Sequence, residues 1–280
     1  MIKLIAIDLD GTLLNNKKEI SHENTAALTE AMEKGLHVSI FTGRSYISGS
    51  EYAKRLGLRV PVVYQNGALI INSDDGKKGV IRKVILSAKR AREIVEAAKK
   101  YGLTYIVFTN FFDLPDMFME RIPENSPFKD YFRANLYRIN IVNDPADFIR
   151  DEGIAEVAVE GPENRILSMV EELGQPMNDL SIVKNNRINE HTFYEFFGPN
   201  VGKNQALDYV VHHLALTPDE IAYIGDNYND VEIMKVVGLP IAMANAPKEV
   251  KDFARYVTTR TNNEHGVAEA VRKIIREEIR

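Results

Sequence analysis

The chain has 280 residues, 45% of them hydrophobic, and its 35 Lys and Arg against 40 Asp and Glu give a formal net charge of −5. This length predicts two modules, and this composition excludes a disordered chain. The acidic balance disfavours nucleic-acid binding, and the absence of cysteine excludes disulfides, thiolate zinc ligands and a cysteine nucleophile.

The N-terminal apolar run ends at Asp8, which makes it too short for the hydrophobic region of a signal peptide. No other segment approaches the roughly 20 apolar residues of a membrane helix. We therefore expect a cytoplasmic protein without a nucleic-acid or membrane partner.

The first third of the chain alternates predicted strands and helices. Leu4–Ile7 is a short apolar run, typical of a strand that is buried on both faces of a sheet. Ser21 is the predicted N-cap of a helix that ends at Gly35. Strands at residues 36–41 and 60–64 follow. Strands separated by helices predict right-handed crossovers and a parallel sheet.

The middle of the chain has a different, α+β pattern. We expect residues 84–188 to form an inserted domain between two parts of a core domain, residues 1–83 and 189–280. Turn-forming residues place the linkers near residues 76–79 and 184–189. The predicted elements are helices at 87–101, 145–150 and 162–173 and strands at 103–108, 137–142, 154–160 and 180–183.

The last third returns to the alternation of the first. A helix is predicted over Lys203–Leu214, a short buried strand over residues 221–224, a helix over 230–237 and a strand over 239–243. A final amphipathic helix contains Val267 and Ile274. The whole pattern predicts an α/β core with a central parallel sheet and an inserted α+β domain.

A pair of acids follows the first predicted strand. Asp8 and Asp10 are two residues apart, so their side chains can point the same way from an extended backbone. Ligands of open α/β sheets bind beyond the carboxyl ends of the strands, which is where this pair lies. Two carboxylates this close repel each other and favour a cation or a shared proton. The alternative is a strand followed by a polar turn.

A second acidic group follows the strand at residues 221–224. If both strands are central in one sheet, Asp226 meets Asp8 and Asp10 at one edge. Such oxygen donors, with room for water, suit Mg²⁺. An Asx-rich turn is the alternative, but two clusters at two strand ends make coincidence improbable.

Two further groups could bind a phosphate. Thr42, Gly43 and Arg44 follow the second strand and offer a hydroxyl and backbone N–H groups to an anion. Lys203 opens a helix, from which its charge could reach an oxyanion. By itself a lone lysine is weak evidence, since most lysines are solvated surface residues.

Together these motifs resemble the haloacid dehalogenase (HAD) superfamily, and within it the Cof-type subfamily of type IIB phosphatases with a C2 cap. The resemblance runs nearly from end to end and implies a Rossmann-like core with an inserted, mobile cap. The matching segments are residues 8–13, 42–44, Lys203 and residues 225–230, with secondary matches at 66–68 and 242–246.

The resemblance implies the roles of the motif residues. Asp8 would be the nucleophile that forms an aspartyl-phosphate, and Asp10 the general acid and then the general base. Asp8, the Asp10 backbone carbonyl and Asp226 would hold Mg²⁺, while Asp230 would orient Lys203 or a metal-bound water from a second layer. The phosphate-binding groups would be the backbone N–H groups of Leu9 and Gly43 and the side chains of Thr42, Lys203 and Asn229.

The leaving group of the substrate would be recognised partly by the cap. The candidates are Arg44, Asn66, Phe111, Phe112, Asp113 and Arg187. Two positions depart from the subfamily pattern: Asn204 stands where Gly is usual, and His265 where Asp is common. Both departures lie outside the four motifs, so they put only the surroundings of the site in doubt.

The resemblance implies a Mg²⁺-dependent phosphatase that acts on small phosphorylated metabolites, such as sugar phosphates. A phosphomutase of the phosphomannomutase type is one alternative, and a non-catalytic sugar-phosphate sensor is another. The sequence indicates neither the physiological substrate nor the oligomeric state.

Overall fold

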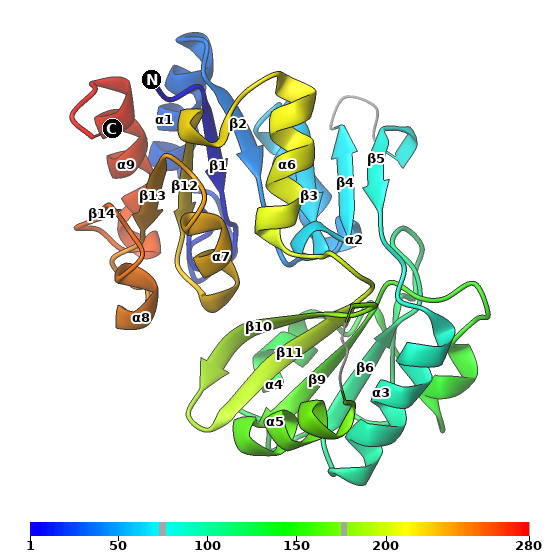
Figure 1. Ribbon diagram of the computed structural model, residues 1–280. Helices are drawn as coiled ribbons and strands as arrows, with labels where there is room; N and C mark the ends of the chain where they lie inside the picture. Colours follow the sequence, from blue (N-terminus) through cyan, green and yellow to red (C-terminus); the bar gives the residue numbers. More distant parts are fainter. Residues whose placement is uncertain (73–76, 175–177, 280) are drawn as a thin grey trace. The chain divides into compact units, whose positions relative to one another are not determined.

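The computed structural model describes residues 1–72, 77–174 and 178–279. The chain divides into two compact units, which Figure 1 shows with the chain coloured from its N-terminus to its C-terminus. The first unit contains Met1–Lys83 and Gly202–Arg280, and the second contains Val84–Val201. The first unit is therefore built from both ends of the chain, and the second is a continuous insertion.

The insertion ends later than residue 188, where we expected it to end. Strand β11 (His191–Phe197) pairs antiparallel with β10 (Ser181–Ile188) and with β9 (Glu156–Pro162), and all three belong to the second unit. The predicted linker at 184–189 is therefore wrong, because it is the end of β10 and the turn of a hairpin. Of the other predicted linker, residue 76 lies outside the described residues, and 77–79 precede β5 within the first unit.

The first unit contains a five-stranded parallel sheet with β1 next to its middle. Its strand order is β14-β13-β12-β1-β2. An isolated parallel bridge between Phe41 and Val63 connects this sheet to an antiparallel sheet of three strands, β3-β4-β5. The strands are β1 (Leu4–Ile7), β2 (His37–Ile40), β3 (Pro61–Tyr64), β4 (Leu69–Asn72), β5 (Val80–Lys83), β12 (Ile221–Gly225), β13 (Leu239–Ala242) and β14 (Tyr256–Val257).

Helices cover this sheet, as the alternating pattern predicted. Leu4 and Ala6 of β1 pack in one apolar core with residues of α6, α7 and α8, whereas Ile5 points to the opposite face because side chains alternate along a strand. Helices α1 and α9 pack against each other. The helices are α1 (His22–Glu33), α2 (Tyr46–Arg55), α6 (Lys203–Leu214), α7 (Val231–Met234), α8 (Lys248–Lys251) and α9 (Gly266–Ile275).

Local sequence signals explain most of these boundaries. The side chain of Ser21 caps α1 by accepting the N–H of Asn24, and Gly35 ends the helix with a φ of +85°. The helix predicted over 230–237 is shorter than expected. It covers only Val231–Met234, and its predicted first residue, Asp230, ends a 3-10 turn, Tyr228–Asp230. The side chain of Asp230 accepts backbone hydrogen bonds in this turn.

The second unit is a six-stranded, mostly antiparallel sheet with helices α3 and α5 on one face. Its strand order is β10-β11-β9-β6-β7-β8. Val107, Val159 and Phe196 point from the sheet into one apolar core with Ile94 of α3 and Ile166 of α5. The elements not yet given are α3 (Ala88–Lys100), β6 (Thr104–Phe108), β7 (Met117–Met119), α4 (Lys129–Ala134), β8 (Ile139–Ile141) and α5 (Glu163–Glu172).

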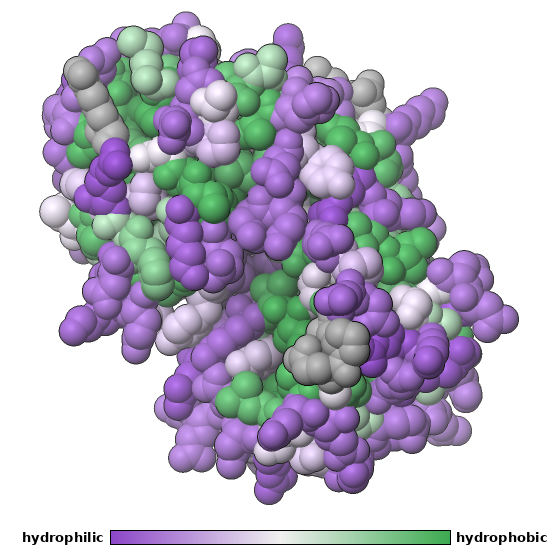
Figure 2. Space-filling model, in the orientation of Figure 1, coloured by the Kyte–Doolittle hydropathy of each residue, from purple (hydrophilic) through white to green (hydrophobic). Residues whose placement is uncertain are grey.

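The two units thus have the α/β and α+β architectures that the sequence predicted. Hydrophilic side chains cover most of the face shown in Figure 2. Within the described parts of the chain, none of the helices combines the length and the apolar character that crossing a bilayer requires.

Candidate active site

Acids from two neighbouring strands meet at the carboxyl edge of the parallel sheet. β1 and β12 pair with Ile7 opposite Ile224, so the residues that follow both strands leave the sheet side by side. The backbone N–H of Asp8 donates to the Ile224 carbonyl at 2.9 Å and continues this pairing. One carboxylate oxygen from each of Asp8, Asp226 and Asp230 lies within 4.8 Å of the other two. The fold therefore gathers acids that are distant in the sequence.

A buried lysine lies between these acids. Lys203 is the first residue of α6, and its Nζ donates to Asp8 Oδ1 and to Asp230 Oδ1, both at 2.6 Å. Nζ also donates to the hydroxyl of Tyr223 on β12 at 3.1 Å, and that hydroxyl donates to Asp230 Oδ1 at 2.6 Å. The side chain of Lys203 is fully buried. It is therefore part of the site and not a solvated surface lysine.

Asp230 is saturated with hydrogen bonds. Its Oδ2 accepts the backbone N–H of Asp226 at 2.8 Å and that of Asn227 at 2.9 Å. Its Oδ1 accepts the bonds from Lys203 and Tyr223. Because an ionised carboxylate offers about four lone-pair sites, all of them are used. Asp230 thus orients Lys203 and the turn after β12, and it has no oxygen left for a further ligand.

The cluster contains three acids and one base. Burial raises the pKa of Asp8 above its usual value, and Lys203 offsets this only in part. Burial, together with the charges of Asp8 and Asp230, raises the pKa of Asp226 well above its usual value. Burial lowers the pKa of Lys203, but the two aspartates beside it raise that pKa more, so the lysine stays protonated. A cation bound here would relieve the remaining repulsion.

The open oxygens of the cluster fit a small divalent cation. Within the described chain, Oδ2 of Asp8 accepts no hydrogen bond. Oδ1 of Asp226 accepts from Thr12 at 2.7 Å, and its Oδ2 has only the amide of Asn245, at 3.4 Å. A free oxygen on Asp8 and a weakly bonded oxygen on Asp226 are a donor set typical of a hard cation that keeps part of its water shell.

The loop after β1 is shaped to approach Asp226. Gly11 has a φ of +81°, and a Cβ at this position would lie 2.2 Å from Asp226 Oδ2. Only glycine allows this conformation and this approach together. The neighbouring hydroxyl of Thr12 then reaches the other oxygen of Asp226. Gly11 and Thr12 thus couple the first motif to the fourth.

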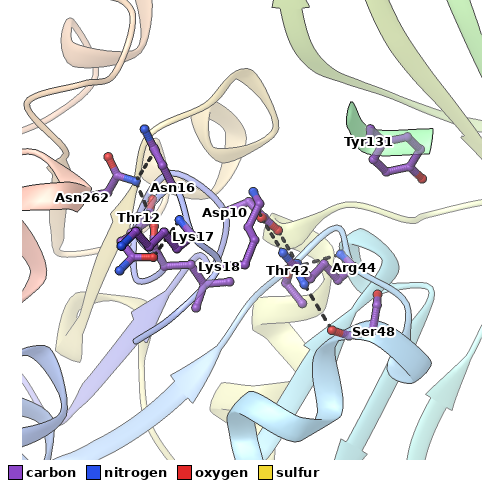
Figure 3. Close-up of polar contacts among 12 residues, drawn as sticks. Asp10, Thr12, Asn16, Lys17, Lys18, Thr42, Arg44, Ser48, Tyr131 and Asn262 are labelled. Atoms are coloured by element: carbon purple, nitrogen blue, oxygen red, sulfur yellow. Dashed lines mark hydrogen bonds and ion pairs between the residues drawn. The ribbon is translucent and has the colours of Figure 1, made fainter. Parts of the chain in front are cut away.

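Asp10 has a different environment from the buried cluster (Figure 3). Arg44 donates to both of its oxygens, from Nε at 2.5 Å and from Nη2 at 2.7 Å, and Lys18 Nζ donates to Oδ1 at 2.6 Å. Burial raises the pKa of Asp10, but the hydrogen bonds and charges of Arg44 and Lys18 lower it more, to about 2. In this arrangement Asp10 is ionised, whereas the role of general acid requires a proton.

Polar groups without protein partners lie at the same edge of the sheet. In the part of the chain that the structure describes, the backbone N–H groups of Leu9 and Gly43 donate to no protein acceptor. Asn229 Nδ2 donates to Asn66 Oδ1 at 2.9 Å, and the Oδ1 of Asn229 is buried without a described partner. Thr42 accepts one backbone N–H on its hydroxyl, which keeps its own proton available. The two backbone N–H groups can therefore donate to an acceptor from outside the protein, such as an anion.

The predicted leaving-group residues of the second unit make contacts within that unit. The rings of Phe111 and Phe112 are tilted against each other with centroids 6.3 Å apart. Arg187 pairs with Glu163 at 3.3 Å, and Asp113 is exposed in the loop that follows the two aromatic residues. Their contact with a substrate stays a prediction.

The two departures from the subfamily pattern lie outside the acidic cluster. Asn204 occupies the first turn of α6, next to Lys203. His265 has a φ of +66° and lies 3.5 Å from Glu23. In the described chain, neither side chain hydrogen-bonds to an acid of the cluster.

Several residues with contacts to the site had no role assigned from the sequence. Tyr223 carries the hydroxyl that joins Lys203 to Asp230, but in the sequence it is one more residue of a buried strand. Lys18 pairs with Asp10 from a loop where lysines are usually solvated. The sequence could have indicated Thr12, because its hydroxyl follows the two acids of the first motif.

The fold and the site define a class of α/β enzymes with an inserted cap domain and a buried acid–lysine cluster at the edge of the sheet. The model of the haloacid dehalogenase-like hydrolase family matches residues 5–271, and the chain belongs to this family. The resemblance that the motifs indicated is therefore confirmed.

Similar proteins are named phosphatases. Phosphatase YwpJ of Bacillus subtilis is 30% identical over 98% of this chain and 100% of its own length. The 5-amino-6-(5-phospho-D-ribitylamino)uracil phosphatase YcsE of the same organism is 31% identical over 97% of this chain and 95% of its own. The chain is accordingly a phosphatase, a phosphoric monoester hydrolase of the HAD family.

Solved structures share the fold over nearly the whole chain. A haloacid dehalogenase-like hydrolase from B. subtilis is 26% identical and covers 97% of this chain and 99% of its own, with a TM-score of 0.80. The HAD subclass IIB sugar phosphatase BT4131 is 19% identical and covers 97% and 98%, with a TM-score of 0.79. The second likeness shows the fold alone.

Proposed function

We propose that this enzyme is a magnesium-dependent phosphatase that hydrolyses small phosphate monoesters through a phosphorylated Asp8. One observation carries the proposal. Asp8 and Asp226, from neighbouring strand ends, each keep an open oxygen in a cluster where a buried Lys203 holds the other oxygen of Asp8 at 2.6 Å. A buried carboxylate that is held through one oxygen and has its other oxygen free of hydrogen bonds is suited to attack phosphorus.

Asp8, the backbone carbonyl of Asp10 and Asp226 would hold Mg²⁺. When bound, the ion supplies positive charge that reduces the repulsion between the carboxylates and the phosphoryl oxygens. Mg²⁺ is favoured over Ca²⁺, because it takes few protein carboxylates and keeps several waters, whereas Ca²⁺ takes six to eight oxygen ligands. Asp230 would not be a ligand, since all its lone pairs are used within the protein.

In the first half-reaction, an oxygen of Asp8 forms a bond to phosphorus while the bond between phosphorus and the leaving oxygen breaks. Lys203 holds and orients Asp8 and adds positive charge beside the phosphoryl group. The unpaired N–H groups of Leu9 and Gly43, with Thr42 and Asn229, would bind the phosphoryl oxygens. Phosphoryl transfer depends mainly on such positioning and charge neutralisation.

In the proposed mechanism Asp10 gives a proton to the leaving oxygen. In the second half-reaction it takes a proton from the water that attacks phosphorus, which releases phosphate and restores Asp8. The ionised Asp10 of this structure suits the second role. The first role requires its contacts with Arg44 and Lys18 to be broken or weakened when the substrate binds. The proposed cap would exclude water at this stage.

The substrate class we propose is small phosphorylated metabolites. The name of YcsE, a ribitylaminouracil phosphate phosphatase, supports it, and the solved structure BT4131 is named a sugar phosphatase. A phosphomutase would use the same first half-reaction but would keep its phosphoryl group. Release of phosphate from a hexose phosphate without a bisphosphate activator would exclude the mutase. The presence of all the proposed catalytic side chains, together with relatives that are named phosphatases such as YwpJ, favours an enzyme over the sensor alternative.

The decisive experiment compares wild type with Asp8→Asn and Asp10→Asn on an aryl phosphate, with and without a chelator. We expect both variants to lose at least about 10³-fold in kcat, and chelation of wild type to have the same effect. Circular dichroism checks that the variants are folded. Full activity of Asp8→Asn would exclude the covalent intermediate, and full activity of chelated enzyme would exclude the metal. Ranking a metabolite panel by kcat/KM then identifies the substrate.

A further inference from the structure

Asn245 connects the two acidic motifs, although the proposed reaction gives it no role. It lies after β13, in the secondary signature at 242–246. Its Nδ2 donates to the carbonyl of Gly11 at 2.8 Å and to Asp226 Oδ2 at 3.4 Å. The loop after β1 and the acid after β12 therefore share one side-chain amide.

A second asparagine orients the first. Asn245 Oδ1 accepts the backbone N–H of Asn262 at 3.0 Å, which fixes its amide so that Nδ2 faces Gly11 and Asp226. The side chain of Asn262 donates to the Leu14 carbonyl at 2.9 Å and to Asn16 Oδ1 at 3.3 Å, and the latter contact is visible in Figure 3. The segment around residue 262 thus holds the loop after β1 at two points.

The exposure of Asn245 argues that these contacts do more than stabilise the fold. Its side chain is exposed to solvent, where water could satisfy the amide equally well. A hydrogen bond at such a position adds little to the free energy of unfolding, because folding exchanges it for bonds to water. What the contact does is orient a charged neighbour, whose other oxygen Thr12 already holds.

We propose that Asn245 is a positioning residue for the metal site, acting through Asp226 and the Gly11 carbonyl. This inference rests on the proposed function. Thr12 and Asn245 hold the two oxygens of Asp226 and so define the plane of its carboxylate. The long bond from Asn245 leaves a lone pair of Oδ2 open for a cation. Hydrogen-bond partners of metal ligands commonly contribute tenfold or more to metal affinity.

The test is to measure Mg²⁺ binding by titration calorimetry for wild type, Asn245→Ala and Asn245→Ser. Neither short side chain can span from residue 245 to both Gly11 and Asp226. We expect a Kd for Mg²⁺ about tenfold or more higher in both variants. The Mg²⁺ concentration for half-maximal hydrolysis of an aryl phosphate should rise by the same factor. At saturating Mg²⁺, kcat should stay within about threefold of wild type, since the reacting groups are intact.

The matched control is Asn263→Ala. Asn263 belongs to the same segment and accepts the backbone N–H of Asn16 at 2.9 Å, but it does not contact Gly11 or Asp226. Its Kd for Mg²⁺ should stay within twofold of wild type. If Asn245→Ala does not fold, the Kd of Asn245→Ser for Mg²⁺ tests the inference.

Two failures can be told apart. A Kd within twofold of wild type in the folded Asn245 variants overturns the inference and leaves the proposed function standing. Wild-type protein that binds no Mg²⁺ and keeps its activity in chelator overturns the proposed function, and the inference with it.

Discussion

Each unit of this protein buries an ion pair, and the two differ in their charge balance. In the second unit, Asp116 and Arg138 form a bidentate pair at 2.6 and 3.0 Å, with side chains 0% and 4% exposed. This pair consists of one carboxylate and one guanidinium, so its own two charges balance. In the first unit, the three carboxylates of Asp8, Asp226 and Asp230 share a single Lys203.

The difference separates a structural pair from a functional one. A balanced and fully hydrogen-bonded pair can stay buried at an acceptable free-energy cost, and it has no affinity left for a ligand. An unbalanced cluster keeps repulsion in the folded state, so it destabilises the fold until a cation binds. Excess buried charge of this kind is what a catalytic site requires and what a structural core avoids.

The largest effect is expected from Lys203→Met. Loss of this cation leaves the buried carboxylates of Asp8 and Asp230 without their charged partner, which should cost about 3–5 kcal/mol of unfolding free energy. Because Lys203 also holds Asp8, kcat on an aryl phosphate should fall by at least about 10²-fold. Urea unfolding and steady-state kinetics measure the two effects. Lys235→Met is the control, as Lys235 pairs with Glu232 at the surface. Near-wild-type kinetics would remove Lys203 from the site.

A similar loss of stability without a loss of activity is expected from Asp116→Asn. The variant leaves the buried guanidinium of Arg138 without its anionic partner, so the unfolding free energy should fall by about 3 kcal/mol. At a temperature where the variant is folded, kcat/KM should stay within about threefold of wild type. Asn135→Ala, which removes a neutral acceptor of Arg138 at 3.0 Å, should cost about 1 kcal/mol. Loss of activity in the folded Asp116→Asn protein would contradict the comparison.

Asp226→Asn is expected to raise the unfolding free energy of the metal-free protein, whereas the two preceding variants lower it. The folded pKa of Asp226 is raised, so its ionisation favours the unfolded state once the pH exceeds the ordinary value of 3.8. In chelator the variant should be more stable than wild type near pH 7, because it lacks the carboxylate whose ionisation the fold disfavours. The gain should shrink as the pH falls towards 4. Thermal unfolding between pH 4 and pH 7 measures this gain in stability. A variant that is less stable than wild type at pH 7 would refute the repulsion between the acids of the cluster.

The smallest effect is expected from Lys18→Met. Lys18 is 55% exposed and Asp10 is 31% exposed, so solvent screens their pair, and its removal should cost less than about 1 kcal/mol at pH 7. Since the folded pKa of Asp10 is lowered to about 2, this contribution is present above pH 3.8 and is lost as the pH falls towards 2. Urea unfolding at pH 7 and pH 3 measures the change, with Lys17→Met as control. A stability difference between Lys18→Met and wild type that does not change with pH would contradict this prediction.

Much of the site was predictable because its residues follow buried strands. The short apolar runs before Asp8 and Asp226 identify parallel strands, and the carboxyl ends of such strands share one edge. The expectation that Asp230 orients Lys203 agrees with their contact at 2.6 Å. The end of the insertion was not predictable. Strand β11 is an apolar run near the boundary, and only its pairing with β9 and β10 decides to which unit it belongs.

The sequence by itself determined the α/β core, the inserted domain and the order of the acidic motifs. The reason is that the hydrophobic pattern and the ends of the strands can be recognised from consecutive residues. Tertiary structure alone decided which oxygens remain open. Lys203 and Tyr223 both donate hydrogen bonds to Asp230. Thr12 donates to one oxygen of Asp226, and Arg44 and Lys18 donate to Asp10. The physical reason is that a hydrogen bond depends on distance and direction, and folding sets both between residues as far apart as Asp8 and Lys203.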